Sequence, residues 1–182
     1  MTHISFEELI KEMRKIKEEN AKLQVLAYTD KMTGVFNRTF FEKWIEENNS
    51  QENYPLLITS LDLNNLKKIN DTFGHKLGDE YIKGAANILK QVFGLESVIC
   101  RIGGDEFVII TPNIGPRSAH SLHKELQRYN ETVKISNGCV ISYSFGSIYS
   151  EHWIDVNDLI KRSDAAMYHM KEEVHKKCAR GE

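Results

Sequence analysis

A narrow apolar seam runs through the charged stretch of residues 5–28. Its positions recur at alternating spacings of three and four residues, which predicts a helix whose a and d heptad positions are apolar. Asn20 falls at an a position, where an amide lowers stability but favours a parallel, in-register dimer. We expect a coiled coil with a second copy; a helix folded onto its own domain is the alternative. The seam consists of Phe6, Leu9, Met13, Ile16, Asn20, Leu23 and Ala27.

A nearly continuous apolar run at residues 55–62 predicts a strand that is buried on both faces and is therefore central in its sheet. Upstream of this run, Asn37 is a suitable N-cap for the helix that follows it. Downstream, the pattern predicts a short helix closed by Gly74, and then a longer helix with an apolar face over residues 81–93 that ends at Gly94.

Two glycines, Gly103 and Gly104, separate two apolar runs within residues 100–110. Because glycine adopts positive φ without a Cβ clash, this pattern predicts a β-hairpin with a two-residue turn. The acids Asp105 and Glu106 follow directly. Carboxylates at a hairpin tip, beside backbone that carries no side chains, leave room for a metal ion and a phosphate. A hairpin that merely carries solvated acids is the plainer alternative.

The remaining pattern predicts a helix from Pro116 to about Glu131 and a second hairpin over residues 133–146, whose Asn-Gly pair is a strong turn signal. A last helix begins at an N-cap, either Asp155 or Asn157.

The order of these elements indicates an α+β fold, in which helices flank a mostly antiparallel sheet. Helices separate the first long strand from the glycine hairpin, so the end of that strand is free to lie beside the hairpin tip. This arrangement would bring Asp62 next to Asp105 and Glu106.

Composition adds limits on the class of protein. A chain of 182 residues with 41% hydrophobic and 27% charged residues suits one globular domain plus an extra element. A net charge of -2 argues against a general nucleic-acid or membrane-surface binder. We expect no membrane span, no signal peptide and a cytoplasmic location. The cysteines Cys100, Cys139 and Cys178 are too far apart for a zinc site or a disulfide framework.

Four segments, in order, carry a resemblance to a known family. They are DKMTGVFNR at residues 30–38, DLNNLKKINDTFGHKLGD at 62–79, GGDEF at 103–107 and SDAAMYHMK at 163–171. Over about residues 28–177 the chain resembles a GGDEF domain, the catalytic domain of diguanylate cyclases. We therefore divide the chain into a signalling helix at residues 1–28 and a catalytic domain at residues 29–182.

The resemblance implies a fold like the palm of nucleotide polymerases and class III nucleotidyl cyclases, with a ferredoxin-like core. It also implies a reaction, in which two GTP condense to cyclic di-GMP and two pyrophosphates. Each domain would hold one GTP, so a homodimer with facing active sites is expected. Mg²⁺ (or Mn²⁺) would assist the displacement.

Residue roles follow from the same resemblance. Asp62 and Asp105 should bind the metal together with the carbonyl of Leu63, and Glu106 should lie near the metal and the attacking hydroxyl. Guanine should be read by Asn70 and Asp79, whose amide and carboxylate match its edge and reject adenine. The remaining substrate-binding residues are expected to be Lys67, Lys171, Gly103 and Gly104.

The sequence departs from the family pattern at three places. Asn64 stands where the family commonly has a second aspartate. His175 stands where a phosphate-binding arginine is usual, so that GTP would be bound less tightly unless Lys176 substitutes for it. Residues 94–97 lack both charges of the inhibitory product site that many members carry, so we expect no tight product inhibition there.

These departures leave a second function open. A degenerate domain would bind GTP or a partner without turnover, and the pair Val174-His175 is the feature that favours it. The intact GGDEF motif and Asp62 favour activity. A cyclase for adenine-containing dinucleotides is disfavoured by Asp79.

Overall fold

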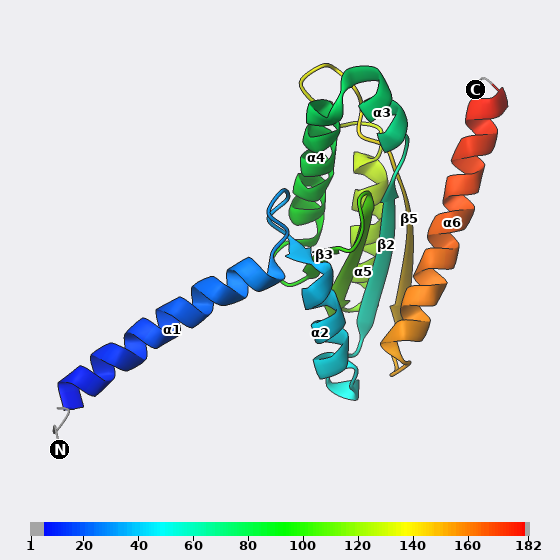
Figure 1. Ribbon diagram of the computed structural model, residues 1–182. Helices are drawn as coiled ribbons and strands as arrows, with labels where there is room; N and C mark the ends of the chain where they lie inside the picture. Colours follow the sequence, from blue (N-terminus) through cyan, green and yellow to red (C-terminus); the bar gives the residue numbers. More distant parts are fainter. Residues whose placement is uncertain (1–5, 181–182) are drawn as a thin grey trace.

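The computed structural model describes residues 6–180, except for the side chains of His175 and of residues 177–180. Its centre is a five-stranded sheet in the order β1-β3-β4-β2-β5, in which only the β1–β3 pair is parallel (Figure 1). This is the mostly antiparallel α+β fold expected from the pattern. The strands are β1 (Phe36–Asn37), β2 (Leu56–Leu63), β3 (Val98–Arg101), β4 (Glu106–Pro112) and β5 (Tyr143–Ser150).

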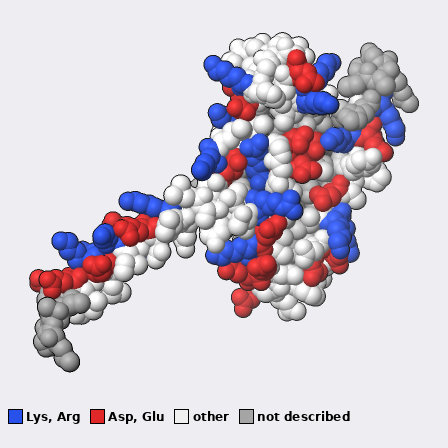
Figure 2. All heavy atoms as spheres, viewed as in Figure 1, with Lys and Arg blue, Asp and Glu red and all other residues white. Residues whose placement is uncertain are grey.

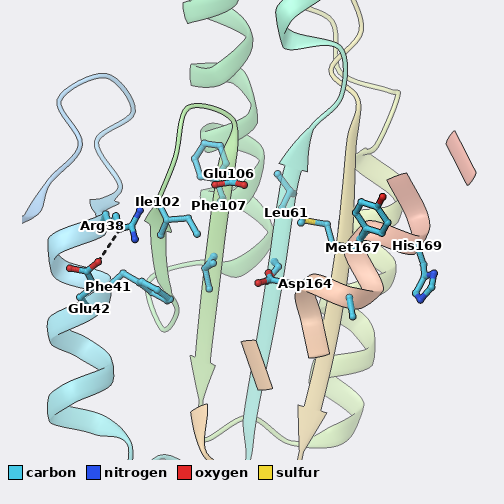
Figure 3. A pocket seen from close by; sticks show the side chains of 14 residues that line it. Arg38, Phe41, Glu42, Leu61, Ile102, Glu106, Phe107, Asp164, Met167 and His169 are labelled. Carbon is cyan, nitrogen blue, oxygen red and sulfur yellow. Dashed lines mark hydrogen bonds and ion pairs between the residues drawn. The ribbon is translucent and has the colours of Figure 1, made fainter. Parts of the chain in front are cut away.

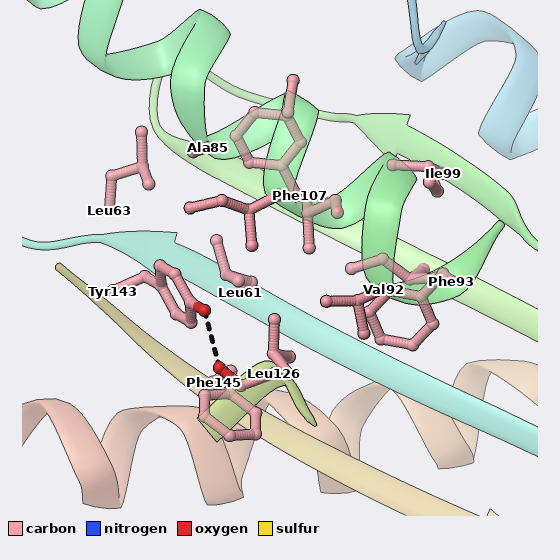
Figure 4. Packing of buried hydrophobic residues seen from close by; sticks show 14 of the residues in the cluster. Leu61, Leu63, Ala85, Val92, Phe93, Ile99, Phe107, Leu126, Tyr143 and Phe145 are labelled. Atoms are coloured by element: carbon pink, nitrogen blue, oxygen red, sulfur yellow. Dashed lines mark hydrogen bonds between the residues drawn. The ribbon is translucent and has the colours of Figure 1, made fainter. Parts of the chain in front are cut away.

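Helices cover both faces of the sheet. The helices are α1 (Phe6–Tyr28), α2 (Arg38–Asn48), α3 (Leu66–Phe73), α4 (His75–Phe93), α5 (Pro116–Tyr129) and α6 (Val156–Arg180), with a 3-10 turn at Gln51–Asn53. One face packs against α4 and α5 in the larger apolar cluster, and the other packs against α2 and α6 in a smaller one (Figures 1 and 4). In the larger cluster, the hydroxyl of Tyr143 donates to the carbonyl of Leu126 at 2.7 Å (Figure 4).

The predicted helix ends are confirmed by their cap geometry. The side chain of Asn37 accepts from the Phe40 amide at 3.0 Å, and Asp155 Oδ1 accepts from the Asn157 amide at 2.8 Å. Gly74 and Gly94 end their helices with φ of 85° and 65°, a conformation that a side chain would strain.

Strand β2 is an interior strand of the sheet, flanked on both sides as its apolar run predicts. All eight of its residues are buried, and it pairs antiparallel with β4 on one side and β5 on the other. Helix α3 then starts after Asn65, which takes a left-handed conformation at φ 60°. The chain therefore turns sharply just beyond Asp62.

One turn prediction is wrong, and one predicted hairpin is shorter than expected. The loop between β3 and β4 has four residues, 102–105, and neither of its glycines has positive φ. The amide of Ile102 donates to the Glu106 carbonyl at 3.0 Å and closes this wider loop. The second hairpin is reduced to one bridge between Lys134 and Val140. Strand β5 begins only at Tyr143, because its partner is β2, with which it pairs along its whole length.

Helix α1 extends away from the body of the molecule (Figure 1). None of its residues, all of which the structure describes, is buried. The predicted helix is therefore present, and its seam is exposed, with Phe6 at 77% and Met13 at 62% of full exposure. Charged side chains gather along one side of α1 and uncharged ones along the other (Figure 2). Among the helices within residues 6–180, none has the length and apolar composition needed to cross a membrane.

Candidate active site

The ends of β2 and β4 bring three acidic residues together. Asp62 lies directly opposite Glu106 in the antiparallel register, and the Leu63 amide donates to the Asp105 carbonyl at 3.0 Å. Side chains directly opposite each other in an antiparallel pair lie on the same face. The expected proximity of Asp62 to the hairpin tip is therefore confirmed.

Helix α6 supplies a cation to this group. Lys171 Nζ lies 2.7 Å from Asp62 Oδ1, although the two residues are 109 positions apart in the sequence. The Asp62 side chain is only 8% exposed and that of Lys171 is 30% exposed. A carboxylate this deeply buried needs a partner to remain charged, and the ammonium supplies one.

A cavity of about 430 Å³ lies where α3, the hairpin and α6 meet. It collects four of the residues expected from the sequence, Leu63, Lys67, Asp105 and Lys171. With Lys68 and Asp71, three lysines and two aspartates line this one space, which suits a polyphosphate bound together with a metal ion. The other lining residues are Asn65, Leu66, Lys68 and Asp71.

Asn70 and Asp79 lie at the junction of α3 and α4 and are not among the residues that line this cavity. Both are half-buried. The side chain of Asn70 packs directly on Gly78, where an added Cβ would come within 1.9 Å of Asn70 Oδ1. Gly78 thus leaves the space that the Asn70 amide occupies.

Glu106 faces a different hollow from Asp105. A groove of about 650 Å³ lies on the α6 side of the sheet, bounded by α2, the hairpin and α6 (Figure 3). Glu106 lines it together with Met167 and His169, and a 2.9 Å ion pair between Arg38 and Glu42 lies on its α2 side (Figure 3). The structure therefore does not gather all the expected site residues into one cavity.

The glycines of the hairpin provide space rather than turn geometry. A Cβ on Gly103 would lie 2.5 Å from Glu106 Oε2, whereas a Cβ on Gly104 would meet nothing within 4 Å. The first glycine therefore makes room for the neighbouring carboxylate. The second leaves the approach to the hairpin backbone open.

An arginine to which the sequence analysis gave no role holds the hairpin in place. Arg101 Nη1 lies 3.3 Å from both carboxylate oxygens of Asp30, and its Nη2 donates to the Gly104 carbonyl at 2.7 Å. Asp30 also accepts from the amide and hydroxyl of Thr33, at 2.9 and 2.5 Å. The segment after α1 is thereby tied to the GGDEF loop.

Burial opposes ionisation of Asp30, but its hydrogen bonds from Thr33 and the charge of Arg101 outweigh that effect and hold the pKa of Asp30 below its ordinary value. The motif signal at residues 30–38 pointed to this segment. The partner, Arg101, lies 71 residues away and carries no local signal.

The donor set suits Mg²⁺. Within residues 6–180, leaving aside the undescribed side chains, no cluster of three or more His, Cys, Asp or Glu residues is assembled for a metal. Mg²⁺ does not need such a cage, because it is usually held by one or two carboxylates, with substrate phosphates and water completing the shell. Asp62 already holds a cationic group at 2.7 Å. Asp62, Asp105 and the Leu63 carbonyl are therefore chemically suitable ligands.

Two of the sequence departures have structural explanations. The amide of Asn64 donates to Ser142 Oγ and accepts from Ser144 Oγ, both at 2.9 Å. Its side chain thus binds the start of β5.

Ser97, which stands at a position of the missing inhibitory site, is buried with its hydroxyl 2.8 Å from that of Thr111. The side chain of His175 lies outside the described residues. Lys176 is exposed and lies 3.9 Å from Glu172.

Comparison with known proteins agrees with this geometry. The family model described as diguanylate cyclase, GGDEF domain, matches residues 27–177. The chain is 28% identical over 154 residues to the probable diguanylate cyclase DgcT of Escherichia coli K12, covering 81% of this chain and 34% of that protein. It is 31% identical over 169 residues to the cyclic di-GMP phosphodiesterase PdeR of the same strain, covering 90% of this chain and 25% of that protein.

The chain therefore spans about a quarter to a third of the length of these two relatives. Among solved structures, the coiled coil and GGDEF domain of DgcB from Caulobacter crescentus, in complex with c-di-GMP, matches with a TM-score of 0.75 at 23% identity. That match covers 90% of this chain and 91% of the other, so the fold is shared over most of both chains. On its sequence motifs, its fold and the family match, the chain belongs to the diguanylate cyclase GGDEF domain family.

Proposed function

We propose that this protein is a diguanylate cyclase, which condenses two GTP into cyclic di-GMP and two pyrophosphates. The observation that supports this most directly is the convergence of Asp105, Lys67 and Lys171 on one cavity, with Lys171 also bonded to Asp62. The likeness to DgcT, which is described as a probable diguanylate cyclase, supports the same reaction.

The reaction is an in-line displacement in which the 3'-hydroxyl of one GTP attacks the α-phosphate of the other. Asp62, Asp105 and the Leu63 carbonyl would hold Mg²⁺ or Mn²⁺, which when bound neutralises phosphate charge and makes the hydroxyl easier to deprotonate. Lys67 and Lys171 add two positive charges against the triphosphate. Gly104 leaves the backbone beside these groups accessible.

Guanine recognition is assigned to Asn70 and Asp79. An amide and a carboxylate together offer the donor and acceptors that the guanine edge requires, while adenine would leave the carboxylate unpaired. We assign Glu106 to the neighbourhood of the attacking hydroxyl, because it lies opposite Asp62 and is exposed on the α6 face.

A single domain binds one GTP, so the reaction requires two domains that face each other. We propose that α1 joins them, because its apolar seam is exposed throughout and Asn20 lies at a position that favours a parallel, in-register pair. Residues that precede the catalytic domain would in this way set how the two active sites meet.

The proposal is tested by incubating the protein with GTP and Mg²⁺ over a range of protein concentrations and resolving the products by mass. We expect cyclic di-GMP, formed with a steeper than linear dependence on protein concentration. Asp105→Ala should abolish it, and Glu96→Ala, a change at an exposed acid outside both cavities, should not.

A domain that binds GTP without turnover is the second candidate, and the presence of His175 in place of an arginine is the observation that favours it. Bound GTP with no cyclic product, even at concentrations that force dimers, would establish that alternative and contradict the cyclase.

A further inference from the structure

The ion pair between Lys171 and Asp62 differs from the other lysine pairs described on α6. Lys161 and Lys176 pair with acids three or four positions away on the same helix, and their side chains are 76% and 68% exposed. Lys171 instead reaches across to β2 and contacts a carboxylate that is 8% exposed. Pairing with a nearby acid on the same helix, as Lys161 and Lys176 do, therefore does not account for the position of Lys171.

This contact conflicts with the roles that the proposed function gives the two residues. Asp62 is to hold a divalent cation, and Lys171 is to contact the triphosphate. An ammonium 2.7 Å from Asp62 Oδ1 competes with any cation for that oxygen, because two positive charges at such short range repel each other strongly. The chain as described therefore has to exchange partners before both roles are met.

We propose that Lys171 is a built-in counter-ion that holds the metal-binding carboxylate of Asp62 until a divalent cation and a nucleotide arrive together. This inference rests on the proposed function. Lys171 then leaves Asp62 for the triphosphate. The binding of metal and nucleotide is consequently coupled, since each removes a competitor of the other, and the coupling is the same in both directions.

The surroundings explain why a counter-ion is needed. Asp62 is buried and lies directly opposite Glu106, and like charges facing each other across an antiparallel pair are destabilising. Without a cation, a buried carboxylate in this position would carry a substantial free-energy cost. Lys171 meets this requirement with a group that the chain itself supplies.

The exchange needs only a side-chain movement. Lys171 contacts Asp62 and also lines the cavity assigned to the triphosphate, so both partners lie within reach of one flexible stem. Helix α6 itself is held firmly on the sheet. The hydroxyls of Ser60 and Ser163 are 2.7 Å apart, and a Cβ on Gly146 would come within 2.2 Å of the Ser163 carbonyl.

The test measures Mn²⁺ binding to the whole chain without nucleotide, by the loss of the free-ion signal in electron paramagnetic resonance. Working at pH 8 keeps the carboxylates ionised. The Mn²⁺ binding that is lost in Asp62→Asn is the binding that depends on Asp62. We expect Lys171→Met to bind Mn²⁺ at least about tenfold more tightly than the unaltered chain at that site. Lys161→Met, on the same helix, should bind like the unaltered chain.

If Lys171→Met does not fold, Lys171→Gln removes the charge while keeping a polar group beside Asp62, and the same gain is expected. Unchanged or weaker Mn²⁺ binding in the folded variant would overturn the counter-ion role, as would the absence of any binding that depends on Asp62. The product assay is independent of this result. If the unaltered chain makes cyclic di-GMP but Lys171→Met binds Mn²⁺ with unchanged affinity, only this inference is refuted. If Lys171→Met binds Mn²⁺ more tightly but the unaltered chain makes no product, only the cyclase activity is refuted.

Discussion

The two faces of the central sheet differ in the side chains that they bury, although they are formed by the same strands. On β2, Leu57, Leu61 and Leu63 point to α4 and α5 and belong to the larger apolar cluster. The alternate residues point to α2 and α6. This second series starts apolar with Leu56 and Ile58, and then continues with Ser60 and Asp62.

The polar half of the second face is buried almost as completely as the apolar face, so each of its polar groups requires a partner. Ser60 bonds to Ser163, Ser144 bonds to Asn64, and Asp62 bonds to Lys171. One face therefore contributes chiefly to stability, and one half of the other face carries residues of the proposed active site. Changes on the two faces should separate these contributions.

The largest effect is expected at the chemical end. Asp105→Asn removes a charge that faces the cavity, and we expect turnover to fall by about a hundredfold to a thousandfold, the loss typical of removing a key electrostatic group. The free energy of unfolding should change by less than about 0.5 kcal/mol, because the residue is not part of the core. Steady-state kinetics and urea denaturation measure the two quantities. A large loss of stability would contradict the separation.

The reverse result is expected on the apolar face. Ile109 on β4 is fully buried in the larger cluster, so Ile109→Ala should lower the free energy of unfolding by about 2–5 kcal/mol through lost burial and a residual cavity. The KM for GTP of the folded protein should not change. Leu95→Ala, at a fully exposed position, is the matched control and should have almost no effect in the same denaturation experiment.

A smaller effect is expected at Gly78, where space and function are linked. An alanine there would place its Cβ 1.9 Å from Asn70 Oδ1 and displace the amide. GTP affinity should fall about tenfold, which is about 1.4 kcal/mol, although alanine is the better helix former. The double-mutant cycle is decisive. In an Asn70→Ala background the same change should cost nothing further, and a full additional loss would show that Gly78 does not act through Asn70.

The smallest effect is expected at Asp30, whose contact with Arg101 joins the segment after α1 to the GGDEF loop. Because the pKa of Asp30 is lowered in the folded chain, its charge stabilises the fold above the unfolded-state pKa of about 4, and that contribution disappears as the pH falls through the lower folded value. Asp30→Asn should therefore reduce the free energy of unfolding at pH 7 by about 1 kcal/mol or less. Once the pH is below the folded-state pKa of Asp30, the variant and the unaltered chain should become equal. A difference that persists at low pH would exclude the charge as its cause.

The sequence predicted those features that depend on local patterns. The apolar run identified β2 as a central strand, and the residues Asn37, Gly74 and Gly94 marked helix ends because capping is a property of a few neighbouring residues. The position of Asp62 beside the hairpin followed from the order of the elements.

Features that depend on distant partners were missed or predicted wrongly. Gly103 is required by the side chain of Glu106, so its presence did not mean a positive φ. Strand β5 is set by its pairing with β2, which the Asn-Gly signal in the preceding loop does not reveal. The contacts of Arg101 with Asp30 and of Lys171 with Asp62 join residues 71 and 109 positions apart. Periodicity and spacing do not report such contacts.

The central claim is that metal and nucleotide meet at the polar end of the α6 face, in the cavity that contains Asp105 and Lys171. Crystals grown with Mn²⁺ and a non-hydrolysable GTP analogue would test it by the anomalous scattering of the metal. The account predicts an anomalous peak within bonding distance of Asp62 and Asp105, with the triphosphate against Lys67 and Lys171. A peak at another place, or an analogue bound only in the groove between α2 and α6, would contradict it.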